Sequence, residues 1–86
     1  MASYKIIWKK SALKELYKIH KDSIPRIVKV VESLISDPLP SGVKKLSGSE
    51  RTYRLRVGNY RVIYELEEDN LIIQIIRVRN RKDVYQ

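Results

Sequence analysis

The first half of the chain carries hydrophobic side chains at two kinds of spacing. Residues 4–8 are rich in strand-forming side chains that alternate weakly with polar ones, which predicts a short strand. Over residues 11–20 apolar side chains recur at helical spacing with lysines between them, which predicts an amphipathic helix capped by Ser11. A similar stripe predicts a second helix that has Pro25 in its first turn and ends near Ser36.

The second half of the chain has the spacing of strands. Residues 37–48 contain two prolines and two glycines among polar residues, which predicts a loop. Apolar and polar side chains then alternate over residues 53–66, and the Gly58-Asn59 pair inside this run is a strong signal for a tight hairpin. After an acidic turn at 67–70, residues 71–78 are almost continuously aliphatic, which predicts a central strand covered on both faces.

This order of elements predicts an α+β fold, strand–helix–helix–strand–strand–strand, for a single domain over residues 1–86. In such a fold two helices pack on one face of an antiparallel sheet. A chain of 86 residues has room for one modest core. We therefore expect a functional site on the sheet face that the helices leave open.

The absence of cysteine narrows the chemistry and the compartment. It excludes disulfide scaffolds, thiol catalysis and cysteine-bound zinc, and a small domain without disulfides suits a reducing compartment. No apolar run approaches the roughly 20 residues of a membrane-spanning helix, and residues 1–10 lack the apolar stretch of a signal peptide. We predict a cytoplasmic protein with no membrane partner.

Basic side chains outnumber acidic ones, 18 against 10, which gives a formal net charge of +8. Such a surplus favours a polyanionic partner: nucleic acid, an acidic membrane face or an acidic protein. Up to Lys45 nine of the ten basic residues are lysines, whereas from Arg51 onward seven of the eight are arginines. Because arginine grips phosphate with a planar fork of donors, we expect the second half to bind the anion.

The predicted hairpin places three arginines on one face of the sheet. With a two-residue turn at Gly58-Asn59, Arg56 lies opposite Arg61, and Arg54 lies on the same face, away from the core. Like charges directly opposite each other destabilise a sheet, so an anion is expected between them. The alternative is that all three are ordinary surface residues that pair with Glu65 or with water.

A second basic cluster begins at the end of the last predicted strand: Arg77, Arg79, Arg81 and Lys82, with Tyr85 close behind. The alternative interpretation is a solvated basic tail. A tyrosine there can stack on a base, anchor the tail in the core, or act as a general base if neighbouring guanidinium groups lower its pKa.

Other catalytic groups are scarce in this sequence. The single histidine, His20, lies on the predicted helix stripe, where a core or helix-end role is favoured, so a mechanism with paired histidines is excluded. The acidic residues around 65–69 are interpreted as a solvated turn, and we predict neither a metal site nor a cofactor. An enzyme acting on RNA would then depend on arginines and tyrosine, with the RNA 2′-OH as nucleophile.

Three stretches stand out together: 44–48 (Lys-Lys-Leu-Ser-Gly), 53–65 (Tyr-Arg-Leu-Arg-Val-Gly-Asn-Tyr-Arg-Val-Ile-Tyr-Glu) and 81–85 (Arg-Lys-Asp-Val-Tyr). With the predicted order of elements, they resemble the RelE branch of the RelE/ParE toxin superfamily of toxin–antitoxin systems. The resemblance implies a ribosome-dependent endoribonuclease that cuts messenger RNA in the ribosomal A site. The implied partners are the 70S ribosome with its messenger RNA and an acidic, RelB-like antitoxin in a hetero-oligomer.

The resemblance also implies roles for individual residues. Arg61 would stabilise the scissile phosphate, Arg81 would stabilise charge or assist the leaving group, and Tyr85 would orient or deprotonate the 2′-OH. Many relatives carry Gly-His where this chain has Arg79-Asn80, so Arg81 becomes the default general acid. The residues implied to bind RNA are Lys44, Lys45, Arg54, Arg56 and Arg79.

Two alternatives come from other classes. A ParE-like toxin would share this architecture but bind DNA gyrase without catalysis; the presence of Arg61, Arg81 and Tyr85 together favours the ribonuclease. A DNA-binding protein built on the two predicted helices is disfavoured, because lysines dominate both helices and neither resembles a recognition helix.

Overall fold

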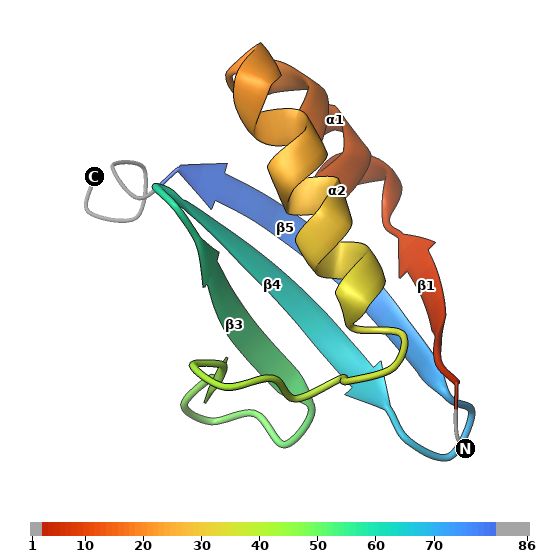
Figure 1. Cartoon of the computed structure of the whole chain (residues 1–86). Helices are drawn as coiled ribbons and strands as arrows, with labels where there is room; N and C mark the ends of the chain where they lie inside the picture. Colours follow the sequence, from red (N-terminus) through yellow and green to blue (C-terminus); the bar gives the residue numbers. More distant parts are fainter. Residues whose placement is uncertain (1–2, 81–86) are drawn as a thin grey trace.

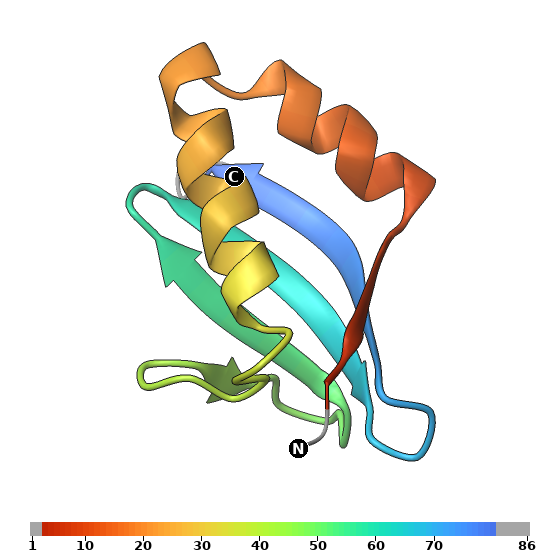
Figure 2. The same cartoon turned by 45° about the vertical axis from the view of Figure 1, so that its right-hand side comes forward.

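Two helices pack on one face of a five-stranded sheet in the computed structural model, which describes residues 3–80 (Figure 1). Figure 2 shows both helices on the same side of the sheet. The α+β class is therefore confirmed. The elements are β1 (Lys5–Trp8), α1 (Lys10–Lys18), the 3-10 helix η1 (Lys21–Ser23), α2 (Ile24–Ser33), β2 (Lys44–Lys45), β3 (Thr52–Val57), β4 (Tyr60–Glu67) and β5 (Ile72–Asn80).

The sheet is mixed, with strand order β1-β5-β4-β3-β2. β2, β3, β4 and β5 pair antiparallel with their neighbours, whereas β1 runs parallel to β5 from Lys5 opposite Ile72 to Trp8 opposite Ile75. The expectation of a wholly antiparallel sheet was thus wrong at β1. The sequence of a four-residue strand does not indicate whether it pairs parallel or antiparallel. The direction of β1 is set by the path of the chain, which passes through both helices before it returns to the sheet.

Both helices are amphipathic, as predicted, but each is shorter than its hydrophobic stripe indicated. α1 buries Ala12 and Leu16, while α2 buries Ile27 and Val31. The predicted cap was wrong, because α1 begins at Lys10 with Ser11 already inside its first turn and makes no side-chain cap hydrogen bond. α2 has its proline in the first turn, as predicted, and ends at Ser33.

The core lies between the two helices and the inner face of the sheet. The part of the chain that the structure describes has these buried hydrophobic residues: Ala12, Leu16, Ile27, Val31, Leu34, Leu55, Val57, Val62, Tyr64, Leu66, Ile73, Ile75 and Val78. β5 was predicted to be covered on both faces, but only its inner face is fully buried, and its side chains alternate in exposure over most of its length. No helix within residues 3–80 is long and apolar enough to cross a bilayer.

A single buried hydroxyl links the sheet to the loop that follows α2. Tyr64 is fully buried, stacks on Tyr53 with ring centroids 5.9 Å apart, and donates a hydrogen bond of 2.6 Å to the carbonyl of Pro38. Burial, followed by the charges of Tyr53 and Asp37, raises the pKa of Tyr64 well above its usual range. The hydroxyl therefore stays protonated and acts as a structural donor.

Tyr64→Phe is expected to lower the free energy of unfolding by about 1 kcal/mol, the usual net contribution of one hydrogen bond. The substitution keeps the ring packing and leaves the Pro38 carbonyl without this donor. Urea denaturation measures the effect. Tyr17→Phe is the matched control, since Tyr17 is 73% exposed on α1, and an equal loss in both variants would contradict the assignment.

The hairpin register predicted from the sequence is confirmed. Val57 pairs with Tyr60, Arg56 with Arg61, and Arg54 with Ile63, across a two-residue turn at Gly58-Asn59. Gly58 has a φ of +60°, which disfavours residues with a β-carbon. A β-carbon here would also lie 3.4 Å from the guanidinium nitrogens of Arg26 on α2, so a larger residue would meet a side chain from outside the hairpin.

A β-bulge interrupts the pairing of the two long strands. Ile63 of β4 lies opposite Arg77 of β5, but its neighbour Tyr64 lies opposite Ile75, so Ile76 is an extra residue on β5. Strict alternation from the buried Ile75 would turn Arg77 and Arg79 toward the core. The extra residue reverses the alternation and places both arginines on the open face.

Candidate nucleic-acid interface

Three arginines form a row across the open face of the sheet. Arg56 of β3 lies opposite Arg61 of β4, and Arg61 lies opposite Arg79 of β5. We call Arg56, Arg61 and Arg79 the arginine row. Directly opposed residues have β-carbons only about 4.5–5.5 Å apart. Three permanent positive charges are thus held side by side on neighbouring strands, an arrangement that favours a bound anion.

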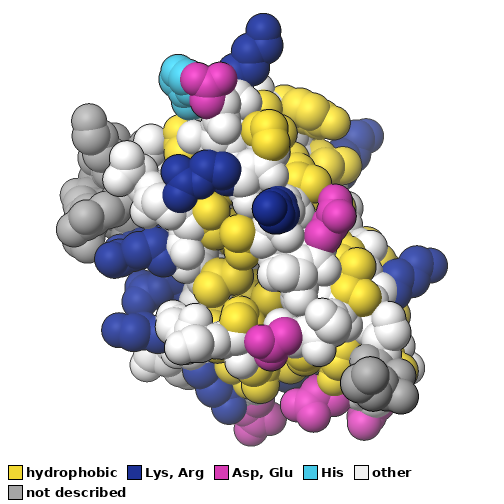
Figure 3. All heavy atoms as spheres, in the orientation of Figure 1, with side chains coloured by type: hydrophobic (Ala, Val, Ile, Leu, Met, Phe, Trp, Pro, Cys, Tyr) yellow, Lys and Arg dark blue, Asp and Glu magenta, His cyan; other side chains and the backbone are white. Residues whose placement is uncertain are grey.

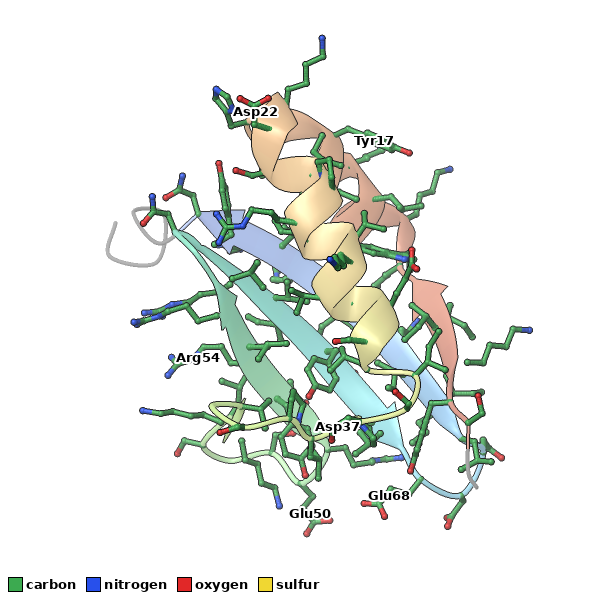
Figure 4. All side chains as sticks on the ribbon, in the orientation of Figure 1. Tyr17, Asp22, Asp37, Glu50, Arg54 and Glu68 are labelled. Atoms are coloured by element: carbon green, nitrogen blue, oxygen red, sulfur yellow. The ribbon has the colours of Figure 1, made fainter. Side chains whose placement is uncertain are left out.

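A second row of side chains lies next to the arginine row. Lys44 of β2 is opposite Arg54, Arg54 is opposite Ile63, and Ile63 is opposite Arg77. Arg54 extends beside β3 away from the helices in Figure 4. In Figure 3 dark-blue side chains gather along the β3 side of the molecule. We call the basic side chains of both rows the basic surface: Lys44, Arg54, Arg56, Arg61, Arg77 and Arg79. This surface spans all four antiparallel strands, β2 to β5.

The two lysines of the predicted loop form the edge strand β2 and lie on different faces. Lys44 shares the open face with its partner Arg54. Lys45 pairs with Tyr53, whose ring packs against the core, so Lys45 lies on the side of the sheet that carries the helices. The structure therefore brings Lys44 to the basic surface and does not bring Lys45 there.

The members of the arginine row differ sharply in exposure. Arg56 is exposed and Arg79 is partly exposed, whereas Arg61 in the middle is only 7% exposed. Sequence reasoning placed Arg61 on this face but gave no reason to expect its burial, which follows from its position on the central strand between two other arginines. A guanidinium stays charged even when it is buried.

One carboxylate lies beside the arginine row, and sequence reasoning missed it. Glu15 Oε2 is 3.6 Å from Arg79 Nε and 3.8 Å from Arg77 Nη1. Glu15 Oε1 accepts a 3.1 Å hydrogen bond from the backbone N–H of Val78. The sequence offers one signal for this role: Glu15 is the one acidic residue in α1, which also contains three lysines.

A pocket of about 480 Å³ opens where α1 ends against β5 and the start of β4. His20 lies in the wall of this pocket. Of the core role and the helix-end role expected for it, it has the helix-end role: it precedes η1, and its Nδ1 accepts a hydrogen bond from the N–H of Asp22 at 3.3 Å. The backbone N–H of His20 donates to the hydroxyl of Tyr60 at 3.4 Å. The full lining is Glu15, Lys18, Ile19, His20, Tyr60, Val78, Arg79 and Asn80.

The open face carries opposite charges at its two ends. Glu65 and Glu67 lie on this face beyond the basic surface, opposite Gln74 and Ile72 of β5. The acidic turn continues to Asp69, and within residues 3–80 no group of three or more potential ligands is placed to hold a metal ion. Two residues predicted to be catalytic, Arg81 and Tyr85, and the nearby Lys82 lie outside the described residues.

Comparisons with known proteins agree on one family. The model for the ParE toxin of type II toxin–antitoxin systems, parDE, matches residues 6–85. Toxin RelE3 of Methanocaldococcus jannaschii is 32% identical over 85 residues, which cover 94% of either chain. These matches span almost the whole sequence, including the hairpin and the last strand.

The fold gives the same result. A chain of the archaeal RelE–RelB complex from Pyrococcus horikoshii OT3 has a TM-score of 0.82 and 30% identity, over 92% of this chain and 96% of that one. A chain of the toxin–antitoxin complex RelBE2 from Mycobacterium tuberculosis has a TM-score of 0.81 and 25% identity, over 92% and 99%. The protein therefore belongs to the RelE/ParE superfamily of type II toxin–antitoxin toxins, as a RelE-like toxin.

Proposed function

We propose that this toxin is a ribosome-dependent endoribonuclease that cleaves messenger RNA in the A site and thereby inhibits translation. The observation that carries the proposal is the arginine row, in which Arg61 is held between Arg56 and Arg79 on the open face. Three opposed guanidinium groups match the phosphate backbone of a single strand. Because like charges directly opposite each other destabilise a sheet, the arginine row favours an anion bound between neighbouring strands.

The proposed reaction uses a nucleophile that the RNA itself supplies. The 2′-oxygen attacks the neighbouring phosphorus and forms a new P–O bond, while the bond from phosphorus to the 5′-oxygen breaks. The products are a 2′,3′-cyclic phosphate, or the 3′-phosphate after hydrolysis, and a 5′-hydroxyl. Arg61 donates to the non-bridging oxygens as negative charge develops, which is the kind of stabilisation that pre-organised donors provide.

The two proton transfers are assigned on the family resemblance. Tyr85 orients or deprotonates the 2′-OH, and Arg81 neutralises or protonates the departing 5′-oxygen. No step in this scheme requires a metal ion or a cofactor, because guanidinium groups balance the charge at phosphorus. The corresponding expectation is a cleavage rate that does not change when metal ions other than the Mg²⁺ that the ribosome itself needs are removed.

The second row supplies binding rather than chemistry. Lys44 and Arg54 lie beside the arginine row, where they contact phosphates next to the scissile one. Arg56 is exposed at the β3 end of the arginine row and binds phosphate there. Lys45, on the helix side of the sheet, is proposed to contact RNA outside this path. These contacts position the RNA but do not distinguish one nucleotide sequence from another.

We also propose an acidic, RelB-like antitoxin as the partner. The P. horikoshii and M. tuberculosis relatives were solved as toxin–antitoxin complexes. A surface with a formal charge of +8 attracts an acidic chain, and a segment lying over the open face would block access to the arginine row. Reversing acidic charges on the antitoxin is expected to weaken the complex.

Induction of the toxin without a partner is expected to stop translation and to leave DNA supercoiling unchanged. The reason is that the arginine row and the Arg81–Tyr85 pair suit RNA cleavage. Mapping of messenger 5′ ends after induction checks it: cuts inside codons, dependent on translation, are expected. Accumulated cleaved gyrase–DNA complexes beside intact messengers would instead favour the ParE-like function.

A further inference from the structure

The carboxylate of Glu15 takes the place of a neighbouring strand at the end of β5. β1 pairs with β5 only as far as Ile75, so within residues 3–80 no strand lies on the β1 side of β5 beyond that point. α1 crosses there, and Glu15 Oε1 accepts the N–H of Val78 at 3.1 Å. An unpaired N–H at this half-buried position would be costly, and a charged acceptor satisfies it strongly.

The same carboxylate forms an ion pair with one side of the Arg79 guanidinium. Oε2 lies 3.6 Å from Nε of Arg79, and this Nε is fully buried although the side chain as a whole is 38% exposed. The exposed part of the side chain therefore lies elsewhere. The closest approach of the carboxylate is at Nε, so we expect the terminal nitrogens Nη1 and Nη2 to be the donors that reach a phosphate beside Arg61.

We propose that Glu15 is a positioning residue that holds Arg79 in place for the substrate phosphate. The proposal rests on the proposed function, since Arg79 is the β5 end of the arginine row. An arginine that is ordered before the substrate arrives loses less rotamer freedom on binding, and its donors are aimed in advance. Through its hydrogen bond to Val78, Glu15 also holds the backbone that carries Arg79.

Removing the charge of Glu15 has two effects of opposite sign, which makes the proposal testable. One negative charge fewer beside the basic surface strengthens the overall attraction for RNA. Loss of the ion pair loosens Arg79 and weakens its contribution in the transition state. A residue that merely tuned net charge would show the first effect alone.

Glu15→Gln is the central variant, because its amide oxygen can still accept the Val78 N–H. We expect a roughly tenfold lower single-turnover cleavage rate on purified ribosomes, a loss typical of a mispositioned group, together with equal or tighter ribosome binding. Glu32→Gln, an exposed substitution on α2, is the matched control for charge and is expected to keep the wild-type rate. A normal rate with tighter binding for Glu15→Gln would overturn the proposal.

A double-mutant cycle separates positioning of Arg79 from any other role. In an Arg79→Ala background, Glu15→Gln is expected to cause little further loss of rate, because the side chain that it positions is gone. Equal slowing in both backgrounds would show that Glu15 acts through something other than Arg79 and would overturn the proposal. Thermal melting of each variant confirms that the compared proteins are folded.

A measurement on the free toxin tests Glu15 independently of catalysis. In ¹⁵N relaxation experiments the Nε–H of Arg79 is expected to become more mobile in Glu15→Gln, while exchange of the Val78 amide stays slow; in Glu15→Ala that amide is expected to exchange faster as well. An Arg79 signal that is unaffected would overturn the proposal. If these shifts occur but the wild-type toxin cuts no messenger RNA, the proposed function fails while the positioning of Arg79 stands.

Discussion

Arg61→Ala is expected to slow cleavage of messenger RNA on ribosomes about 100-fold or more, which corresponds to roughly 3 kcal/mol of transition-state stabilisation from one pre-organised donor. Arg61 is the buried middle member of the arginine row. We therefore expect that neither neighbouring arginine can take over its contact with the phosphate. Because Arg54 and Arg56 remain, ribosome binding is expected to weaken far less. Single-turnover rates with a defined codon in the A site measure the effect.

Arg51→Ala is the matched control for this prediction. Arg51 is exposed just before β3, near the acidic turn and away from the arginine row, so its removal takes one positive charge without touching the proposed site. Arg61→Met keeps more of the buried volume, so it separates loss of the guanidinium from loss of packing. Equal rates for Arg61→Ala and Arg51→Ala would remove Arg61 from the mechanism.

Tyr85→Phe is expected to lower the cleavage rate by about 100-fold while ribosome affinity stays nearly unchanged. The substitution keeps the ring, which can still stack on a base, and removes the hydroxyl that is proposed to orient or deprotonate the 2′-OH, a contribution in the range of general-base catalysis. An interaction made only in the transition state lowers the rate without weakening binding.

The informative contrast for Tyr85 is between its ring and its hydroxyl. If Tyr85 only anchors the end of the chain, Phe would replace it freely, and Tyr85→Ala would lower binding and rate together. A Tyr85→Phe rate equal to that of the wild-type toxin would leave the arginines and the 2′-OH of the RNA as the whole catalyst.

The parts of the fold that depend on local pattern could be predicted from the sequence. A two-residue turn allows one register only, so Gly58-Asn59 together with the alternation on either side determined every pair of the β3–β4 hairpin, including Arg56 opposite Arg61. The helical stripes likewise gave α1 and α2, with errors confined to their ends. Helix ends depend on the packing of the following loop, which no spacing of side chains records.

The rest of the site depends on contacts between distant segments. The bulge at Ile76 determines which face Arg77 and Arg79 occupy, and a continuous aliphatic run offers no alternation from which to infer it. The contact between Glu15 and Arg79 joins residues 64 positions apart and exists because α1 crosses the end of β5. The direction of β1 is a similar case, since it follows from the path of the whole chain.

The two-residue strand β2 has a consequence for how this toxin behaves at high concentration. A sheet that ends in a long unpaired strand invites a second molecule to add its own strand, and from there aggregates can grow. Here Lys44 and Lys45 pair with Arg54 and Tyr53 at the β3 border, and the rest of β3 carries the exposed Arg56, so the border presents charges that repel an identical neighbour. The protein can therefore keep this sheet face open without recruiting copies of itself along that border.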